Sequence, residues 1–181
     1  VRGRGLMYAL CEGGGFHTKG WVSGLEPPNT SAVRKVQKFI ISQNKADFRD
    51  SNGLCMFLNI EWEEIVNLLN LVTGWNLTPD DYLETGERIH TLARAFNVRD
   101  GFNREDDKLP PRQMNEPTPK GKAKGCKAFI SKEDFEKCLD KYYSLRKWNK
   151  KGEPTYKTLA KLGLEDIAED LKKRKIIASK K

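Results

Sequence analysis

The sequence predicts an all-α protein, a single multi-helix domain with about five or six helices around one core. Apolar residues recur at three- and four-residue steps in several segments, which is the spacing of amphipathic helices. Residues that cap helices precede these segments, and glycine or proline follows them. No stretch of useful length alternates apolar and polar residues as a half-buried strand would.

The first half of the chain predicts a glycine-rich segment and then two helices. Residues 1–29 are expected to be loop, with a short helical piece over 6–11. A helix is expected from residue 31 to about residue 49, and Gly53 is its stop signal. The next helix is expected over 61–71, with acidic residues in the first turn, where the helix dipole favours them.

Two capping boxes mark the starts of later helices. Thr78 is followed by Pro79 and by Asp81, which closes the box of a helix that ends near residues 97–101. Ser131 with Asp134 opens another helix in the same way.

The remaining segments predict irregular chain and two short helices. Residues 101–130 contain four prolines, which break any helix there. Short helices are expected over 155–162 and 164–173. We therefore expect two parts, a glycine-rich loop segment over 1–29 and a helical body over 30–181.

Composition excludes several classes of protein. The 181 residues include 33 Lys and Arg against 25 Asp and Glu, a net charge of +8, and 38% are hydrophobic, which is enough for a core. No apolar run approaches the ~18 residues of a membrane span, and we expect no secretory leader. Four cysteines without a C-x-x-C pair are too few for a disulfide scaffold, so a reducing cytoplasm is the expected compartment. The chain opens with Val1 rather than Met, which leaves open a C-terminal piece of a longer protein or a trimmed chain.

Cys55 is the first candidate for chemistry, because it follows the helix stop at Gly53. A thiolate beyond a helix end, surrounded by backbone N–H groups and apolar neighbours, suits an iron–sulfur ligand. Asp50 lies near the helix end and can accept hydrogen bonds from a heterocycle held over the turn. The alternative is a buried structural cysteine, since free cysteines are among the most buried residues.

His17 and Lys19 form a second candidate pair, flanked by glycines. Two residues apart in an extended segment, they project to the same side. Histidine can pass a proton, and lysine supplies a positive charge for a phosphate or another acceptor. The alternative is a solvated loop in which the two side chains are unconnected. His90, within a predicted amphipathic helix, is expected to be a surface or helix-packing residue.

Charged residues are dense between positions 88 and 112, and their signs are mixed. This mixture favours salt bridges within the protein or a domain contact over a phosphate-binding stripe. No P-loop or dinucleotide-binding pattern occurs.

Six runs of residues form a set that is more specific together than singly, and they cover most of the chain. They are Asp50–Phe57, Thr73–Thr78, Gly86–Ile89, Arg94–Phe102, Asp106–Arg112 and the segment from Tyr142 to Thr155. In this order they resemble the last helical domain of the tungsten-dependent aldehyde:ferredoxin oxidoreductase family. The first run is similar to the family's D-S-x-G-L-C-x-F stretch.

The resemblance implies a function and cofactors. Enzymes of this family carry a tungsten (sometimes molybdenum) bis-pterin and a 4Fe–4S cluster, oxidise aldehydes to carboxylic acids and pass the electrons to ferredoxin. Their fold has a β-rich cofactor-binding domain followed by two helical domains. The implied partners are the missing N-terminal cofactor domain, ferredoxin and an aldehyde, with no membrane, and a homo-oligomer through the longer protein stays open.

Five site residues follow from the resemblance by position. Cys55 would be the fourth cluster ligand, Asp50 would bind a pterin, and the Leu54–Cys55 backbone would lie against it. Lys19 would contact a pterin, and His17 would sit in the substrate pocket as a proton donor or a partner of the carbonyl oxygen.

The chain also departs from the family. It lacks the other three cluster cysteines, which the family keeps in a C-x-x-C-x-x-x-C group, and the cofactor-cradling first domain. Lys147 stands where the family has glycine. We therefore expect the isolated chain to bind no tungsten and to catalyse nothing.

Two other functions remain open at this stage. One is a non-enzymatic basic helical module that binds nucleic acid or an acidic protein through its net charge and its lysine tracts at 120–127 and 172–181. It gives no reason for the Asp50–Phe57 run, so nucleic acid is the weaker partner. The other is a standalone relative that keeps the helical scaffold as an assembly subunit.

Overall fold

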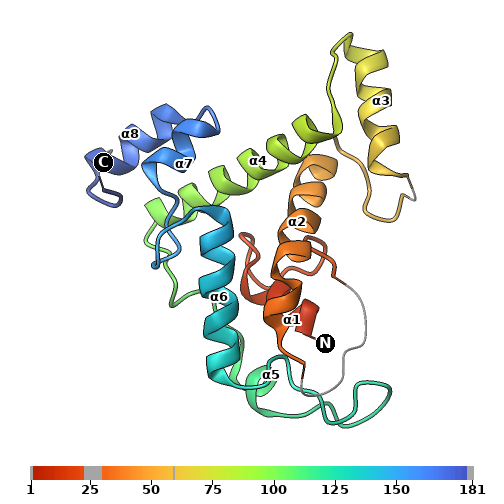
Figure 1. The fold of residues 1–181 in the computed structure, drawn as a ribbon, viewed down its shortest axis with the longest axis vertical. Helices are drawn as coiled ribbons and strands as arrows, with labels where there is room; N and C mark the ends of the chain where they lie inside the picture. Colours follow the sequence, from red (N-terminus) through yellow and green to blue (C-terminus); the bar gives the residue numbers. More distant parts are fainter. Residues whose placement is uncertain (1, 23–29, 59, 179–181) are drawn as a thin grey trace.

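A computed structural model describes residues 2–22, 30–58 and 60–178, and these residues form eight α-helices, one 3₁₀ helix and no strand (Figure 1). The all-α prediction is confirmed for the described residues. In chain order the elements are α1 (Arg2–Ala9), η1 (Ala32–Lys35), α2 (Val36–Ser51), α3 (Trp62–Thr73), α4 (Pro79–Arg99), α5 (Pro111–Asn115), α6 (Lys132–Arg146), α7 (Tyr156–Lys161) and α8 (Glu165–Lys173). Within these ranges, no helix has the length and apolar character needed to cross a membrane.

The predicted helix starts are largely confirmed. At α4, Thr78 and Asp81 form both bonds of the capping box. At α6, Ser131 Oγ accepts from the N–H of Asp134 as predicted. The Asp134 carboxylate does not close that box, because it accepts instead from the Ser31 hydroxyl and the N–H of Ala32. It thus joins the start of α6 to the start of η1.

The chain begins with α1, a longer helix than the short helical piece expected over 6–11. Glycines disfavour a helix by about 1 kcal/mol each, so the first turn of α1 could not be predicted from local propensity. These glycines allow close packing. A Cβ on Gly3 would lie 2.2 Å from the carbonyl oxygen of Val22, and one on Gly5 would lie 3.1 Å from the ring of Phe129.

A single helical turn, α5, lies in the segment that was expected to be irregular. Pro111 occupies its first turn, where a missing N–H removes no helical hydrogen bond. The prolines therefore limit this helix to five residues rather than preventing it.

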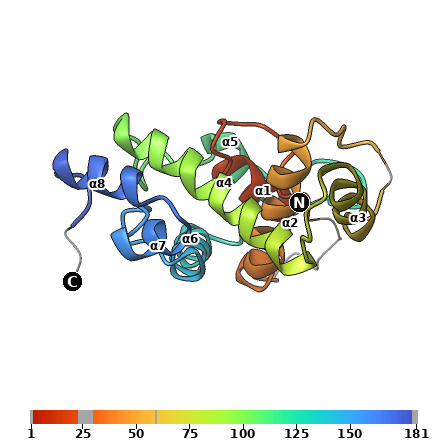
Figure 2. The ribbon, with the colours of Figure 1, turned by 90° about the horizontal axis from the view of Figure 1, so that it is seen from above.

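The long helix α4 crosses the molecule and links its parts (Figures 1 and 2). Its N-terminal end packs with α2 and α3 through Tyr82, Phe48 and Ile65. Its C-terminal end packs with α7 and α8 through Ala95 and Leu159. A third and larger core lies between α1, α2 and α6. Helix α2 is thus covered on two sides, and its C-terminal end is left beside the loop that follows α1.

Candidate functional site

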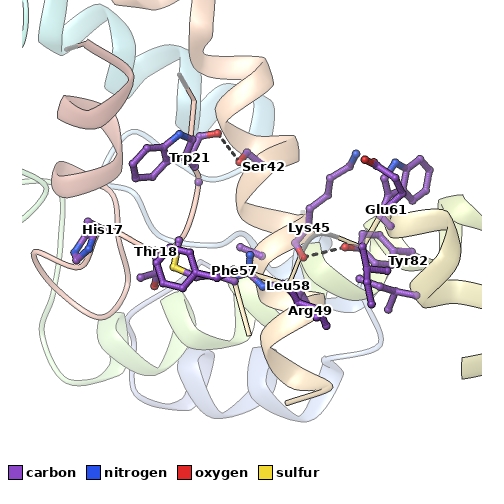
Figure 3. Close-up of a pocket in the computed structure, with 16 residues that line it drawn as sticks. His17, Thr18, Trp21, Ser42, Lys45, Arg49, Phe57, Leu58, Glu61 and Tyr82 are labelled. Atoms are coloured by element: carbon purple, nitrogen blue, oxygen red, sulfur yellow. Dashed lines mark hydrogen bonds between the residues drawn. The ribbon is translucent and has the colours of Figure 1, made fainter. Parts of the chain in front are cut away.

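A cavity of about 590 Å³ lies where the loop after α1 meets α2, α3 and the turn between them. Figure 3 shows polar and aromatic side chains from all of these segments around it. The residues that line it are His17, Thr18, Gly20, Trp21, Ser42, Lys45, Ala46, Arg49, Met56, Phe57, Leu58, Ile60, Glu61, Trp62, Ile65 and Tyr82. Two apolar side chains of the lining are open to solvent, and we call them the apolar rim: Phe57 is 85% exposed and Trp21 is 45% exposed.

Two hydrogen bonds fix the walls of this cavity, and Figure 3 marks both. Ser42 Oγ donates to the carbonyl of Trp21 over 3.1 Å, which ties the loop to α2. The Tyr82 hydroxyl donates to the carbonyl of Lys45 over 3.0 Å, which ties α4 to α2. Burial raises the pKa of Tyr82 to about 12, so its hydroxyl stays neutral as a donor.

His17 is the one predicted site residue that lines the cavity. Its side chain is exposed, and its ring lies 6.3 Å from the ring of Phe16. Gly20, three residues later, has φ +77°, and a Cβ there would lie 2.4 Å from the ring of Phe39. Glycine at this position lets the loop turn against α2 and present His17 to the cavity.

Cys55 follows the end of α2 in a tight turn. Helix α2 ends at Ser51, Gly53 takes φ +69°, and the N–H of Leu54 donates to the carbonyl of Arg49 over 3.3 Å. Cys55 is a free cysteine and is exposed. The alternative of a buried structural cysteine is therefore wrong. The next three residues, 56–58, line the cavity, whereas Cys55 itself does not.

Asp50 lies on the last turn of α2 and is exposed. Its Oδ1 accepts from Arg49, over 3.0 Å from Nε and 2.6 Å from a terminal nitrogen. An exposed ion pair of this kind contributes at most about 1 kcal/mol to stability. Asp50 is therefore available to a further hydrogen-bond donor at the surface beside the cavity.

Lys19 is turned inward. Its Nζ lies 2.7 Å from Oε1 of Glu12 and 2.6 Å from Oδ1 of Asp47. Burial alone would lower the pKa of Lys19, but the hydrogen bonds to Asp47 and Glu12 outweigh it and raise the pKa above its ordinary value. The ammonium is therefore a permanent charge. The Lys19 side chain therefore links the loop to Asp47, in the C-terminal half of α2.

Sequence reasoning missed a buried polar cluster behind the loop. His90 is only 2% exposed, and its Nδ1 lies 3.0 Å from Oδ2 of Asp47 and 3.4 Å from Oε2 of Glu12. Of the two roles expected for His90, the surface role is wrong. One signal was present: Gln43 and Asp47 follow Phe39 at four-residue steps, so polar residues occupy the core face of α2.

Three side chains near the loop after α1 have the residue types and the spacing of a metal site. Among the described residues, one group of His, Cys, Asp or Glu side chains is close enough to share a metal ion: Glu12, Asp47 and His90, with ligand atoms within 4.8 Å of one another. The ammonium of Lys19 already bridges the two carboxylates of this group. The protein thus supplies its own cation there.

The donor chemistry at Cys55 fits one ligand of an iron–sulfur cluster. An exposed thiol can reach a cluster that lies outside this chain. It does not form a complete site, because Cys126 and Cys138 are buried and Cys11 is half-buried. Burial raises the pKa of Cys138 to about 12, which disfavours the thiolate that binds iron. The remaining ligands would have to come from another part of a longer protein.

Comparison with known proteins identifies the family of this helical fold. The family model described as "Aldehyde ferredoxin oxidoreductase, domains 2 & 3" matches residues 1–164. The chain belongs to the aldehyde ferredoxin oxidoreductase family.

Curated relatives place the chain more closely within this family. It is 33% identical over 178 residues to the tungsten-containing aldehyde ferredoxin oxidoreductase of Pyrococcus furiosus, with 92% of this chain and 29% of the relative covered. The enzyme of the same name from Pyrococcus horikoshii is also 33% identical, with 92% and 28% covered. The "aliphatic sulfonate oxidoreductase, WOR-like subunit" of Pyrococcus furiosus is 32% identical, with 94% and 26% covered. The chain therefore spans less than a third of the length of these relatives.

A solved structure shares the fold. The active-site complex BamBC of benzoyl coenzyme A reductase, in complex with 1,5-dienoyl-CoA, superposes with a TM-score of 0.71. The match covers 89% of this chain and 24% of that chain, at 23% sequence identity.

Proposed function

We propose that this chain acts as the C-terminal helical part of a tungstopterin iron–sulfur oxidoreductase that oxidises aldehydes to carboxylic acids. Ferredoxin is the proposed electron acceptor, as in the name of the family. The observation that carries the proposal is the exposed Cys55 beyond the end of α2, directly before three residues that line a cavity together with His17. Family membership supports the class of reaction, since the matched relatives are named as oxidoreductases.

In this proposal the chain contributes contacts to cofactors held mainly elsewhere. Cys55 would be one thiolate ligand of a 4Fe–4S cluster, while Asp50, the Leu54 backbone and Lys19 would face a pterin. When bound, the tungsten (or molybdenum) bis-pterin and the cluster supply the redox chemistry. Asp50 offers a carboxylate at the surface. Lys19 uses two of its three N–H donors for Glu12 and Asp47, and the third would remain for a pterin.

His17 is the proposed catalytic residue. Its imidazole is exposed at the cavity, where it can donate a proton to a carbonyl oxygen or take one from a reacting group. The apolar rim, including Phe57 and Trp21, would exclude water around a small substrate once a further part of the protein covers it.

The aldehyde is the most specific part of the proposal. Relatives of nearly equal identity are named for different substrates, aldehydes in one case and aliphatic sulfonates in another. The cavity wall combines Lys45 and Arg49 with aromatic rings, so it can accept a substrate with an anionic end. The alternative of a basic module without enzymatic activity rests on the net charge and on the lysine tracts at 120–127 and 172–181, and it gives no reason for the Asp50–Phe57 run.

Replacement of Cys55 in the complete native protein tests the proposal. Cys55→Ser should lower the iron content per chain and abolish electron transfer to ferredoxin, because a cluster ligand is lost. Cys11→Ser is the matched control, since Cys11 is half-buried in the loop after α1 and is not a proposed cluster ligand. Iron content and ferredoxin reduction that are unchanged in Cys55→Ser would contradict the proposed role.

Replacement of His17 tests the catalytic role separately. His17→Gln should reduce kcat by about 10²–10⁴-fold, the usual contribution of a general acid or base. Metal and iron contents should equal those of the unmodified protein, because an exposed side chain holds neither the fold nor the cluster. A variant with full kcat would remove His17 from the reaction.

A further inference from the structure

Four ionisable side chains form a group that we call the His90 cluster, in which Asp47 and His90 are buried and Glu12 and Lys19 are half-buried. Glu12 and Lys19 come from the loop after α1, Asp47 from α2 and His90 from α4. Each carboxylate uses one oxygen for Lys19 and directs the other toward Nδ1 of His90. The cluster thus joins the loop that carries His17 to two helices.

The surroundings of Tyr142 decide where the imidazole of His90 carries hydrogen. The Gln43 amide donates from Nε2 to the carbonyl of Leu10 over 3.1 Å, and its Oε1 accepts from Arg146 over 3.1 Å. This fixes Oε1 as the atom that faces Tyr142, whose hydroxyl donates to it over 2.8 Å. The same hydroxyl lies 2.8 Å from Nε2 of His90, and it has no second hydrogen to donate. Nε2 must therefore be the donor.

The opposite side of the ring then lacks a hydrogen. With Nε2 protonated, a neutral His90 presents a lone pair at Nδ1 to Oδ2 of Asp47 and Oε2 of Glu12. Oε2 of Glu12 is buried and accepts no hydrogen bond from any described residue. Two ionised carboxylates and a lone pair at this separation would repel one another. One further proton between these three atoms relieves the repulsion.

The charges around the ring favour a proton on the carboxylate side. Burial lowers the pKa of His90 well below its ordinary value, and Arg146 on α6, Lys19 and Arg94 act in the same direction, while Glu12 opposes them. Burial raises the pKa of Asp47, although Lys19, Arg146 and Glu12 oppose this shift. Tyr142 and the stacked ring of Trp148 complete the surroundings without charge. A neutral imidazole that accepts a hydrogen bond from a protonated carboxyl satisfies every contact.

We propose that Asp47, Glu12 and His90 hold one shared proton and act together as positioning residues for Lys19. The shared proton leaves the two carboxylates with a single negative charge, which the ammonium of Lys19 balances at 2.6–2.7 Å. The backbone of Glu12 is held as well, because the Asn97 amide donates to its carbonyl over 2.8 Å. The cluster therefore fixes both sides of the loop around His17. The benefit to catalysis rests on the proposed function, whereas the shared proton does not.

Nitrogen-15 NMR of the imidazoles tests the shared proton directly. The chain has two histidines, and His17→Gln removes one signal, so assignment is immediate. On the 181-residue chain near pH 7, His90 should carry hydrogen on Nε2, with Nδ1 either accepting a hydrogen bond or protonated. A ring with hydrogen only on Nδ1, or a free acceptor at Nδ1, would overturn the proposal. This readout uses the unmodified chain, so it depends on no cluster variant that must fold.

Acylation of amines, followed by peptide mass spectrometry, tests the positioning of Lys19. In the unmodified chain Lys19 should react more slowly than exposed Lys157. Asp47→Asn and Glu12→Gln should speed its reaction about tenfold, which corresponds to about one unit of ammonium pKa. The control Glu84→Gln, at an exposed position on α4, should leave the rate unchanged. Equal rates for Lys19 and Lys157 in the unmodified chain would contradict the positioning role, and neither readout needs a cofactor or an aldehyde.

Discussion

At the scale of single residues, the buried charge of Arg94 is paired with a carboxylate outside its own helix. Arg94 on α4 is paired with Asp107 through two hydrogen bonds of 2.8 and 2.7 Å, and its Nε donates to the carbonyl of Gly152 over 2.9 Å. The Tyr143 hydroxyl donates to the same carboxylate. The pair therefore joins α4, α6 and the two loops that face them.

Breaking this buried pair should be costly. Asp107→Asn leaves the charge of Arg94 buried without a counterion, which we expect to lower the free energy of unfolding by about 3 kcal/mol. The control is Glu116→Gln, because Arg112 and Glu116 form an exposed pair that is 83% and 63% accessible. That change should cost about 0.5 kcal/mol or less. Denaturant unfolding measures both, and equal losses would contradict the assigned importance of the buried pair.

The resemblance implies glycine at the position of Lys147, and the backbone there explains why glycine would suit it. It caps α6 with φ +57° and ψ +33°, a left-handed conformation that costs a residue with a Cβ about 1–2 kcal/mol. Its side chain is exposed. Lys147→Gly should therefore raise the free energy of unfolding by about 1 kcal/mol. Lys150→Gly, at a position without positive φ, should give no gain, and a loss at position 147 would refute this account.

At the scale of elements, α2 and α4 depend on close contact at one glycine. A Cβ on Gly86 would lie 2.1 Å from the carbonyl oxygen of Asn44, so the two backbones almost touch there. Asn44 in turn accepts a 2.6 Å hydrogen bond from the buried Arg146 of α6. Three helices are thus held at this crossing.

Gly86→Ala should push α2 and α4 apart. We expect a loss of about 1–3 kcal/mol in the free energy of unfolding, despite the better helix propensity of alanine. Gly13→Ala is the control, since no atom lies within 4 Å of a Cβ there and the change should be near zero. Thermal or denaturant unfolding measures the stability of both variants. A Gly86→Ala variant that is more stable than the unmodified protein would contradict the close contact of α2 and α4.

Local signals explain which elements could be predicted from the sequence. Capping residues such as Thr78 and Ser131 act on their own helix, so six helices were predicted near their observed positions. Helix α1 was only partly predicted because Gly3 and Gly5 serve tertiary packing. The position of Cys55 after a helix stop was predictable, but its exposure was not. The His90 cluster was not predictable, since the partners of His90 lie 43 and 52 residues away.

At the scale of the whole molecule, alkaline pH should unfold the protein by removing buried protons. Burial raises the pKa of Tyr142 from 10 to about 12, and Arg146 only partly opposes this shift. The folded state thus binds the proton more tightly than the unfolded state does. Stability is therefore fully present below pH 10 and is lost between about pH 10 and 12. Denaturant midpoints measured across this range should fall, and a flat profile would contradict the burial of Tyr142.

The chain spans 29% of the length of one tungsten-containing relative, and it exposes Cys55 and the apolar side chains of Phe57 and Trp21. In the proposed function the helical part supplies one cluster ligand, pterin contacts and His17, and the isolated chain should bind neither tungsten nor iron. Addition of iron and sulfide to the isolated chain should therefore leave no cluster, as judged by visible absorption. A stable cluster on this chain alone would contradict the assignment of Cys55 as one ligand among four.

The most direct test is the intact mass of the protein from its native source, with metal analysis of the same sample. The proposed function predicts a species several times heavier than 20.7 kDa that contains tungsten or molybdenum and about four iron atoms per chain. A metal-free protein of 20.7 kDa that purifies without a partner would contradict it.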